Sequence, residues 1–317
     1  MRFRTDERLI KRHLLIDFNN VFYKAIHVAK HIDKVPSADR VIFHFFRMLS
    51  SWIREMPPDQ MRVSFFYDGR PVRRIAMDST YKATRVQTDE TKALIELTRP
   101  TITRLIESCD VDVYGLPDAE ADDLIATFAK ENEGDLVIVL SDDKDFFQLL
   151  TVPGVVIFRP CEGVGSRFVD AERSAEIMGS KSGQDKHLVY PSQIRLFKAL
   201  CGDPSDNIKG VFRLQRKFAA HMSQAKDVDE MIEKYLPDIP ETTRVKVMDY
   251  MESIRKNYEI VGFQFDCDLA KALKSKRPAE DREALLSQHT KLRFMDLRCF
   301  GVHTKAPSYT PDFLSDL

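Results

Sequence analysis

Five short apolar runs in the first half of the chain constrain its fold more than any other feature. They cover His13–Ile16, Arg62–Tyr67, Val111–Tyr114, Leu136–Leu140 and Val155–Phe158. The runs are rich in Val, Ile and Phe and lack clean alternation, which is typical of strands buried on both faces of a parallel sheet. Helical patterns separate them, at Val41–Ile53, Thr91–Cys109 and Ala121–Glu131. Strands that alternate with helices predict an α/β fold, in which helices flank a mostly parallel central sheet. Within the second helical pattern, Pro100 predicts a break or a new start.

The pattern changes beyond residue 160. Residues 163–186 are rich in Gly, Ser and charge, which predicts a loop or insert. The chain then becomes mainly helical, with candidate helices at Ser192–Cys201, Arg213–Ser223, Asp227–Tyr235 and Glu241–Tyr258. These observations predict a core over residues 1–188 and a helical region over residues 189–317.

Composition excludes several classes of protein. Hydrophobic residues make up 43% of the 317 positions and charged residues 31%, so we expect a substantial core and a charged surface. The five cysteines are scattered without a CxxC pair, which argues against a zinc site or a disulfide framework. The first 13 residues hold no apolar signal segment, and no apolar stretch is long enough to cross a membrane. We therefore expect a cytoplasmic monomer.

Carboxylates follow the apolar runs or form tight acidic clusters. The set is Asp17, Asp68, Glu120, Asp122, Asp123, Asp143, Asp145, Asp203 and Asp206. Functional groups gather beyond the carboxyl ends of parallel strands, so we expect these acids to converge. One such acid alone is usually a helix cap or a solvated loop residue. Many together need cations, because two like charges ~4 Å apart repel by about 1 kcal/mol even in water. Oxygen ligands without matching Cys or His predict two Mg²⁺ ions, for which Mn²⁺ can substitute, acting on a phosphodiester.

A phosphatase with an aspartyl nucleophile is one alternative. That chemistry needs a second aspartate two residues after the first, as general acid, and Asn19 occupies this position after Asp17. The sequence therefore disfavours this alternative.

Six segments in order resemble the flap endonuclease family of 5′ nucleases, and in particular its phage-type 5′→3′ exonucleases. They read LLIDFNN, FFYDGR, YKATR, AEADD, LSDDKDF and CGDPSDNIKGV, and the resemblance covers roughly residues 13–217. The resemblance implies a PIN-like nuclease core with a helical arch near residues 70–95 and a helical duplex-binding region. It also divides the acids between two metal sites. The first comprises Asp17, Asp68, Glu120 and Asp122. The second comprises Asp143, Asp145, Asp203 and Asp206, with Asp123 near both and Asp142 a neighbour that is no ligand.

The resemblance implies catalytic roles for Lys82 and Arg85, whose positions are three apart and would share one face of a helix. Cations placed in advance near a scissile phosphate would stabilise the charge that develops in the transition state. Further contacts to nucleic acid are expected from Tyr23, Arg70, Arg73, Arg74 and Tyr81. The alternatives are a solvated basic helix around Lys82 and a core position for Tyr23.

A basic segment follows the last acids. Lys209, Arg213, Arg216 and Lys217 are its basic residues, and it contains no acid. The family has a helix–hairpin–helix-like duplex anchor here, but Arg213 and Gln215 stand where its two glycines would be. This degenerate pattern predicts duplex binding by charge, and it disfavours a tight hairpin with a bound K⁺ ion.

These expectations combine into one predicted function. The chain is expected to act as a 5′→3′ exonuclease and flap endonuclease on DNA with 5′ ends, flaps or nicks, and on RNA–DNA hybrids. Primer or flap removal during replication, in a bacterial host cell if the chain is phage-encoded, would be its role. The acidic–hydrophobic end at residues 309–317 suggests docking to a sliding clamp or to a single-strand-binding protein. The alternative is a non-catalytic, structure-selective DNA-binding protein on the same fold, although none of the expected acids is missing.

Overall fold

The computed structural model describes residues 11–32, 36–56, 61–180 and 187–278, together with Glu283, Ala284 and Ser287. Contacts between its parts divide the chain into two compact units. The first unit comprises Met1–Asn20, Gln60–Gln87 and Tyr114–Leu273, and the second comprises Val21–Asp59, Thr88–Val113 and Lys274–Leu317. The predicted docking segment at residues 309–317 lies outside the described residues.

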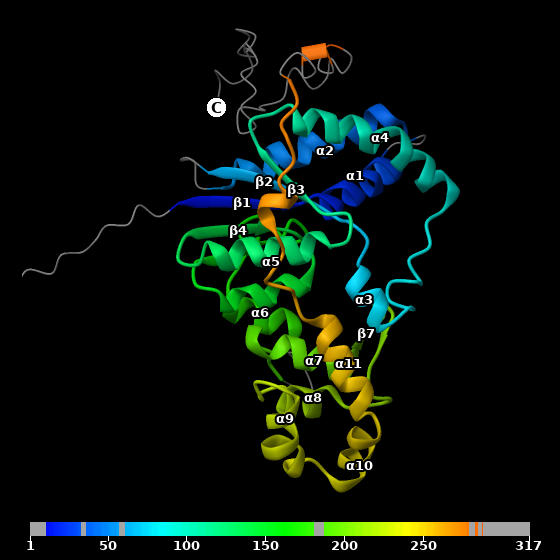
Figure 1. The fold of residues 1–317 in the computed structure, drawn as a ribbon, viewed down its shortest axis with the longest axis vertical. Coiled ribbons are helices and arrows are strands. Elements are labelled where there is room, and N and C mark those ends of the chain that lie inside the picture. Colours follow the sequence, from blue (N-terminus) through cyan, green and yellow to red (C-terminus); the bar gives the residue numbers. More distant parts are fainter. Residues whose placement is uncertain are drawn as a thin grey trace, which may run out of the picture. The chain divides into compact units, whose positions relative to one another are not determined.

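A six-stranded sheet organises the fold, with the strand order β3-β2-β1-β4-β5-β6 (Figure 1). Its strands are β1 (Arg12–Asp17), β2 (Arg62–Tyr67), β3 (Asp112–Gly115), β4 (Leu136–Leu140), β5 (Val155–Phe158) and β6 (Phe168–Val169). Strand β1 pairs in parallel with β2 and β4, β4 pairs in parallel with β5, and β6 is antiparallel to β5. All five predicted strands are confirmed, and their ends lie within one residue of the predicted ones. The sixth strand was missed because two residues are too short to form a pattern.

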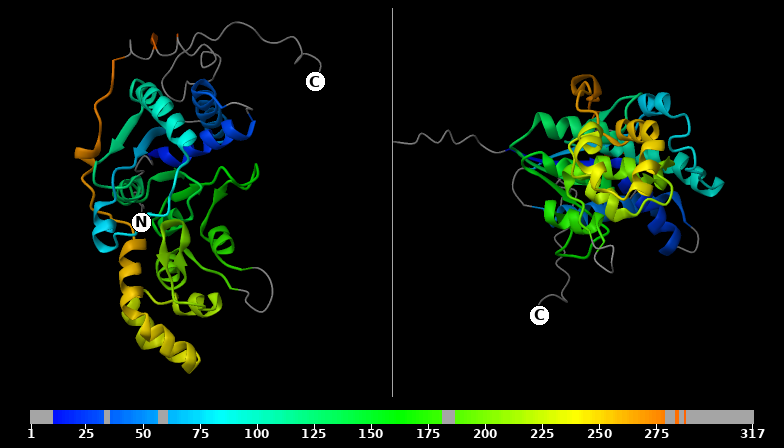
Figure 2. Two further views of the ribbon diagram at one scale, coloured as in Figure 1. Left: turned by 90° about the vertical axis from the view of Figure 1, so that its right-hand side faces the viewer. Right: turned by 90° about the horizontal axis from the view of Figure 1, so that it is seen from below.

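Helices complete the first unit. They are α3 (Val72–Met77), α5 (Ala121–Glu131), α6 (Ala171–Met178), α7 (Ile194–Cys201), α8 (Arg216–Met222), α9 (Val228–Glu230), α10 (Glu241–Asp249), α11 (Met251–Val261) and α12 (Leu269–Ala272). Helices α10 and α11 follow one another in yellow and gold, separated at Tyr250 (Figure 2). Further helical segments, which are not regular α-helices, are η1 (Lys144–Thr151), η2 (Pro191–Gln193), η3 (Pro204–Asp206), η4 (Met231–Tyr235) and η5 (Leu236–Asp238). Strands β7 (Gly202–Asp203) and β8 (Ile208–Lys209) form a small antiparallel hairpin between α7 and α8. The predicted mainly helical character of this region is confirmed.

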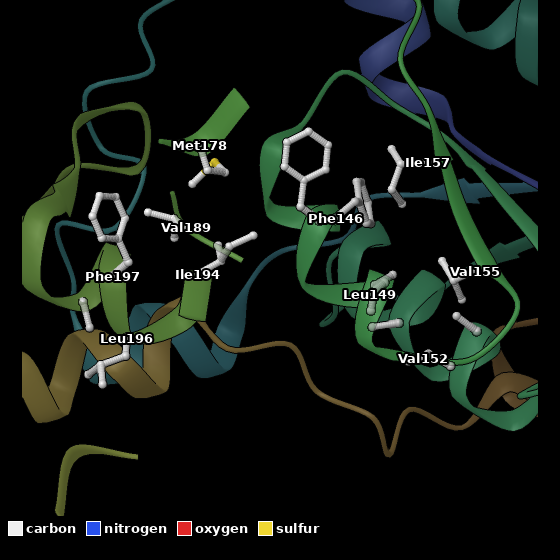
Figure 3. Packing of buried hydrophobic residues seen from close by; sticks show 14 of the residues in the cluster. Phe146, Leu149, Val152, Val155, Ile157, Met178, Val189, Ile194, Leu196 and Phe197 are labelled. Carbon is white, nitrogen blue, oxygen red and sulfur yellow. The ribbon is translucent and has the colours of Figure 1, made fainter. Parts of the chain in front are cut away.

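One hydrophobic cluster joins the sheet to the helical region. Helix α5 contacts β1 and β2, and its buried Leu124 and Phe128 belong to this cluster. Side chains from η1 and β5, including Phe146 and Ile157, share it with Phe197 of α7 (Figure 3). The contacts therefore group the helices after residue 190 with most of the sheet in one unit.

The second unit contains most of α1 (Phe18–Ile32), together with α2 (Ala38–Ile53) and α4 (Asp89–Glu107). Helix α4 runs through Pro100 without a break, so that prediction is wrong. Pro100 lies on the exposed side of the helix, where water can satisfy the carbonyl that loses its hydrogen bond. None of the described helices is both long and apolar enough to cross a membrane.

Candidate metal centre

The parallel register places the first acids at one edge of the sheet. Ile16 of β1 pairs with Leu140 of β4, so Asp17 lies beside the residue that follows β4, Ser141. The Asp17 carboxylate accepts hydrogen bonds from the Ser141 hydroxyl at 2.9 Å and from the Asn20 amide at 3.1 Å. Burial first, and then the neighbouring Asp68 charge, raise the pKa of Asp17 to about 7. An acid held in this way is costly to ionise unless a cation comes close.

Asp68 connects strand β2 to the acidic start of α5. One of its oxygens accepts a hydrogen bond from the Ala121 amide at 2.7 Å, and the other accepts one from the Asn19 side chain. This contact fixes the helix end that presents Glu120 and Asp122. Asp68 is itself exposed, so its carboxylate remains open to solvent.

Asp122 and Asp143 lie at the same edge of the sheet, and nearby positive charge only partly balances their carboxylates. Burial raises the pKa of Asp122 well above its ordinary value, and the charges of Asp143, Asp68 and Asp17 add to this effect against the opposing charge of Lys82. Burial likewise raises the pKa of Asp143. These mutual effects require the carboxylates to be close together, as the sequence predicted for the ends of parallel strands.

Asp145, Asp203 and Asp206 form a second group. One carboxylate oxygen from each lies within 4.8 Å of the other two, a spacing that suits a bound metal ion. Asp145 lies in the first turn of η1, which Asp143 caps, while Asp203 and Asp206 belong to the hairpin region after α7. Residues about 60 apart in sequence therefore supply one group of candidate ligands.

Lys198 lies between two of these acids, and the sequence analysis missed it. Its ammonium group forms ion pairs with Asp145 and with Asp203, the latter at 2.6 Å. Burial of Asp203 disfavours its charge, but Lys198 and the bonds from Ser205 prevail and lower the pKa of Asp203. The only available signal was a basic residue five positions before Asp203 on an apolar helix, which also fits a solvated surface lysine.

The segment around Lys82 is a turn rather than the predicted helix. Lys82 has a φ of +56°, a left-handed conformation that no α-helix contains, so the shared helical face with Arg85 is wrong. Both cations nevertheless reach the acids. Lys82 forms an ion pair with Glu120, and Arg85 forms one with Asp206 at 2.5 Å. The Tyr81 hydroxyl lies 3.3 Å from a Glu120 oxygen and 3.2 Å from an Asp206 oxygen, between the two groups of acids.

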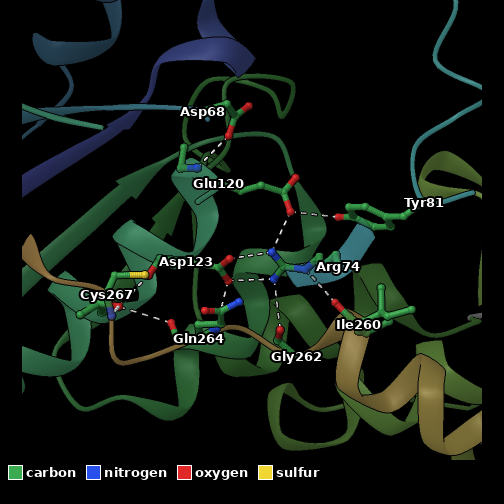
Figure 4. Close-up of polar contacts among 12 residues, drawn as sticks. Asp68, Arg74, Tyr81, Glu120, Asp123, Ile260, Gly262, Gln264 and Cys267 are labelled. Carbon is green, nitrogen blue, oxygen red and sulfur yellow. Dashed lines mark hydrogen bonds and ion pairs between the residues drawn. The ribbon is translucent and has the colours of Figure 1, made fainter. Parts of the chain in front are cut away.

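Arg74 has a different environment from the solvent-facing one that was predicted. It is 5% exposed, and both oxygens of Asp123 accept hydrogen bonds from its guanidinium, at 2.6 and 2.8 Å (Figure 4). A further bond joins it to Glu120 at 2.7 Å, and two more join it to the carbonyls of Ile260 and Gly262. Asp123 therefore has its charge balanced by a buried arginine, and protein groups occupy the guanidinium of Arg74.

The other predicted contact residues occupy varied positions. Arg70, Arg73, Lys209, Arg213 and Arg216 are exposed, and Lys217 is half-buried. Tyr23 lies on α1 in the second unit and is 38% exposed, so it is not a core residue. The Asp142 carboxylate accepts a hydrogen bond from the Cys161 amide at 2.8 Å, as suits a neighbour of the acids rather than a ligand.

A cleft of about 430 Å³ opens beside the second group of acids. Its lining includes Asp143, Asp203, Lys198 and Arg216. The cleft therefore offers negative and cationic groups side by side.

The residues present suit hard divalent cations. The donors are carboxylate oxygens, several of which are buried with raised pKa values and lack a full complement of positive charge. Magnesium and manganese prefer such ligands, whereas zinc sites use Cys and His.

Comparisons with known proteins agree with this geometry. A family model described as 5′-3′ exonuclease, N-terminal resolvase-like domain, matches residues 12–179. The chain is 28% identical over 294 residues to the thermostable DNA polymerase I of Thermus filiformis, which is 90% of this chain and 33% of the polymerase. It is 28% identical over 248 residues to DNA polymerase I of Bacillus subtilis, which is 77% of this chain and 26% of that protein. The chain thus spans about a third or less of the length of these relatives.

Solved structures share the fold. A bacteriophage T5 protein co-crystallised with metal ions superposes with a TM-score of 0.61 at 20% identity, covering 89% of this chain and 99% of that one. The bacteriophage T5 flap endonuclease in a complex with DNA and metal ions gives 0.59 at 19% identity, covering 88% and 100%. These likenesses confirm the predicted α/β fold with a helical C-terminal region.

Proposed function

The chain belongs to the 5′-3′ exonuclease family, and from this premise we propose that it hydrolyses phosphodiester bonds near 5′ ends. Its substrates would be DNA with 5′ ends, flaps or nicks, and RNA–DNA hybrids, for primer or flap removal in replication. The proposal rests chiefly on one observation. Buried carboxylates from distant parts of the chain meet at one edge of the sheet, where Lys82 and Arg85 face them.

We assign the acids to two Mg²⁺ ions, for which Mn²⁺ can substitute. Asp17, Asp68, Glu120 and Asp122 would hold the first, and Asp143, Asp145, Asp203 and Asp206 the second. Asp123 would support the first group through Arg74, because both of its oxygens bind this one buried guanidinium. When bound, such ions lower the pKa of water and neutralise charge on a leaving oxygen. The products would carry a 5′-phosphate and a 3′-hydroxyl.

Lys82 would act through its charge and not as a base. Burial opposes its protonation, but Asp122 and Glu120 outweigh burial and raise the pKa of Lys82 above its ordinary value. It therefore stays protonated at neutral pH. Together with the guanidinium of Arg85, it would stabilise the transition-state phosphate, and a scissile phosphate would compete for them with Glu120 and Asp206.

The exposed basic residues would hold the duplex. Lys209, Arg213, Arg216 and Lys217 follow the second group of acids closely in sequence, so contacts to phosphates there would orient a strand toward them. Arg70, Arg73 and Tyr23 are further proposed contacts. A sliding clamp or a single-strand-binding protein is the proposed replication partner.

Cleavage of a 5′-labelled flap and of a nicked duplex, with Mg²⁺ or with EDTA, tests this function. We expect metal-dependent products, and we expect Asp143→Asn to abolish them while most DNA binding remains. Asp142→Asn is a matched control, since its carboxylate binds the Cys161 amide and should leave cleavage intact. Absence of any metal-dependent product across flapped, nicked and hybrid substrates would favour the non-catalytic binding protein instead.

A further inference from the structure

An exposed aromatic–basic pair lies at the tip of the loop between β8 and α8. Phe212 is 61% exposed, and the guanidinium carbon of Arg213 lies 4.9 Å from the centre of its ring. A single exposed aromatic side chain on a protein surface needs no function. Three further features distinguish this one: a fixed support, an unfavourable backbone conformation and a segment whose charged residues are all basic.

The base of the loop is held firmly. The Asn257 side chain is 4% exposed and donates to the carbonyls of Lys209 at 2.8 Å and Ala199 at 3.1 Å. The Val211 amide donates to the Leu200 carbonyl at 2.8 Å. The backbone of Gly210 lies so close to α7 that an added Cβ would be 2.1 Å from the Cys201 carbonyl carbon. The tip therefore projects from a rigid base.

Arg213 adopts a left-handed backbone conformation, with a φ of +53°. Its Cβ makes this conformation unfavourable, and glycine would adopt it readily. The other described non-glycine residues with positive φ are Lys82 and Asn207, and both border the acids. Unfavourable backbone conformations persist at functional sites, where a side chain's contribution outweighs the strain. At residue 213 the retained side chain is a cation beside an exposed ring.

The charged residues of the segment that carries the tip are all basic. Residues 209–217 include four basic residues and no acid. Another exposed phenylalanine of this unit, Phe265, is 48% exposed but is followed by Asp266 and Asp268. Phosphates would be attracted to the first ring and repelled from the second.

We propose that the Phe212–Arg213 tip is a wedge for duplex DNA, an inference that rests on the nuclease function proposed above. The Phe212 ring would enter the minor groove and partly unstack a base step, while Arg213 would bind an adjacent phosphate. Phe212 lies six positions after Asp206. Six residues reach at most about 20 Å when fully extended, so the wedged step would lie within roughly six base pairs of the metal centre at about 3.4 Å per pair.

Fluorescence of 2-aminopurine tests the wedge without cleavage. The probe is placed at successive positions of a nicked duplex, and the protein is added in EDTA. We expect fluorescence to rise at one or two neighbouring positions within about six base pairs of the nick. Phe212→Ala should remove the rise and weaken binding about 5- to 150-fold, as loss of one base–aromatic contact does. Phe265→Ala is the control and should change neither.

The cation is tested separately through salt. Arg213→Gly permits the same left-handed turn but removes the charge, so it should reduce the slope of log K against log salt by about 0.9. Phe212→Ala should leave that slope unchanged. Circular dichroism melting checks that both variants fold, as expected for exposed positions.

Two results would overturn the wedge. One is the absence of a fluorescence rise at every duplex position while binding persists; the other is a rise that Phe212→Ala leaves intact. A response confined to single-stranded probes would also refute a duplex wedge. Failure of the nuclease proposal is distinguishable, because it would appear as absent cleavage in Mg²⁺ while the fluorescence signal in EDTA remained.

Discussion

Replacing Arg74 should cost more stability than replacing any exposed arginine of the same helix. All five N–H donors of its guanidinium are used, three by carboxylates and two by backbone carbonyls. Arg74→Met leaves Asp123, which is 1% exposed, without its counter-charge. Removing one partner of a buried ion pair typically costs about 3–5 kcal/mol. Total stability is only about 5–15 kcal/mol, so at least about a fifth of it is at stake.

The matched control is the preceding residue, Arg73. The Arg73 side chain is 52% exposed and its nitrogen lies 3.9 Å from a Glu259 oxygen, so Arg73→Met should cost about 0–1 kcal/mol. For a chain of this size, about 1 kcal/mol shifts Tm by roughly 2–4 °C. We therefore expect Tm to fall by roughly 6–20 °C for Arg74→Met and by less than about 4 °C for Arg73→Met. Thermal melting followed by circular dichroism measures both.

A second substitution separates charge from shape. Asp123→Asn in the Arg74→Met background removes the unpaired carboxylate, so it should recover part of the lost Tm. Arg74→Lys keeps the charge but cannot bind both Asp123 oxygens in parallel, and it should fall between wild type and Arg74→Met. The reasoning is refuted if the loss of Tm for Arg74→Met lies within the range of the Arg73→Met control. It is also refuted if adding Asp123→Asn to Arg74→Met lowers the Tm further.

Three further predictions concern charge. Lys82→Ala should slow single-turnover cleavage about 10²–10³-fold, as loss of one transition-state donor does, and weaken DNA binding much less; an unchanged rate at saturating substrate would show that Lys82 is only a surface cation. Lys198→Gln should tighten Ca²⁺ binding measured by calorimetry, because it frees Asp145 and Asp203 from a competing cation, and weaker binding would mean that Lys198 instead holds these acids in place. Burial lowers the pKa of His13 in the folded protein below 6.5, so the unfolded chain binds more protons and stability should fall as pH drops through 6.5. Urea unfolding at pH 7 and pH 5 should therefore show a shallower pH dependence of stability for His13→Gln than for the wild type. An equal pH dependence of the two would contradict the assignment.

The sequence was sufficient for features with a short-range signature. A strand of β-branched and aromatic residues, buried on both faces, leaves a continuous apolar run, and β4 was predicted to the residue. The convergence of acids followed from parallel topology, since the carboxyl ends of parallel strands share one edge. Both inferences needed only neighbours in sequence and a general rule about sheets.

Features that depend on distant contacts could not be predicted. Arg73 and Arg74 are adjacent and alike in sequence, and distant partners such as Gly262, 188 residues away, distinguish the buried one. Lys198 resembles any helical lysine until Asp145 is brought beside it. The left-handed conformation of Lys82 is likewise set by tertiary contacts, including the hydrogen bond that its backbone amide donates to the Asp206 carbonyl at 3.0 Å.

The firm base beneath residues 211–215 has a consequence for how such a chain can change over generations. Asn257 and Gly210 fix the base through backbone groups, so they place no demand on the side chains at the tip. Substitutions at Phe212 or Arg213 can therefore accumulate without disturbing Asp203 and the other acids. The tip would then diverge rapidly among descendants that retain one hydrolytic chemistry, and exchange of these few residues would be a compact route to new substrate preferences.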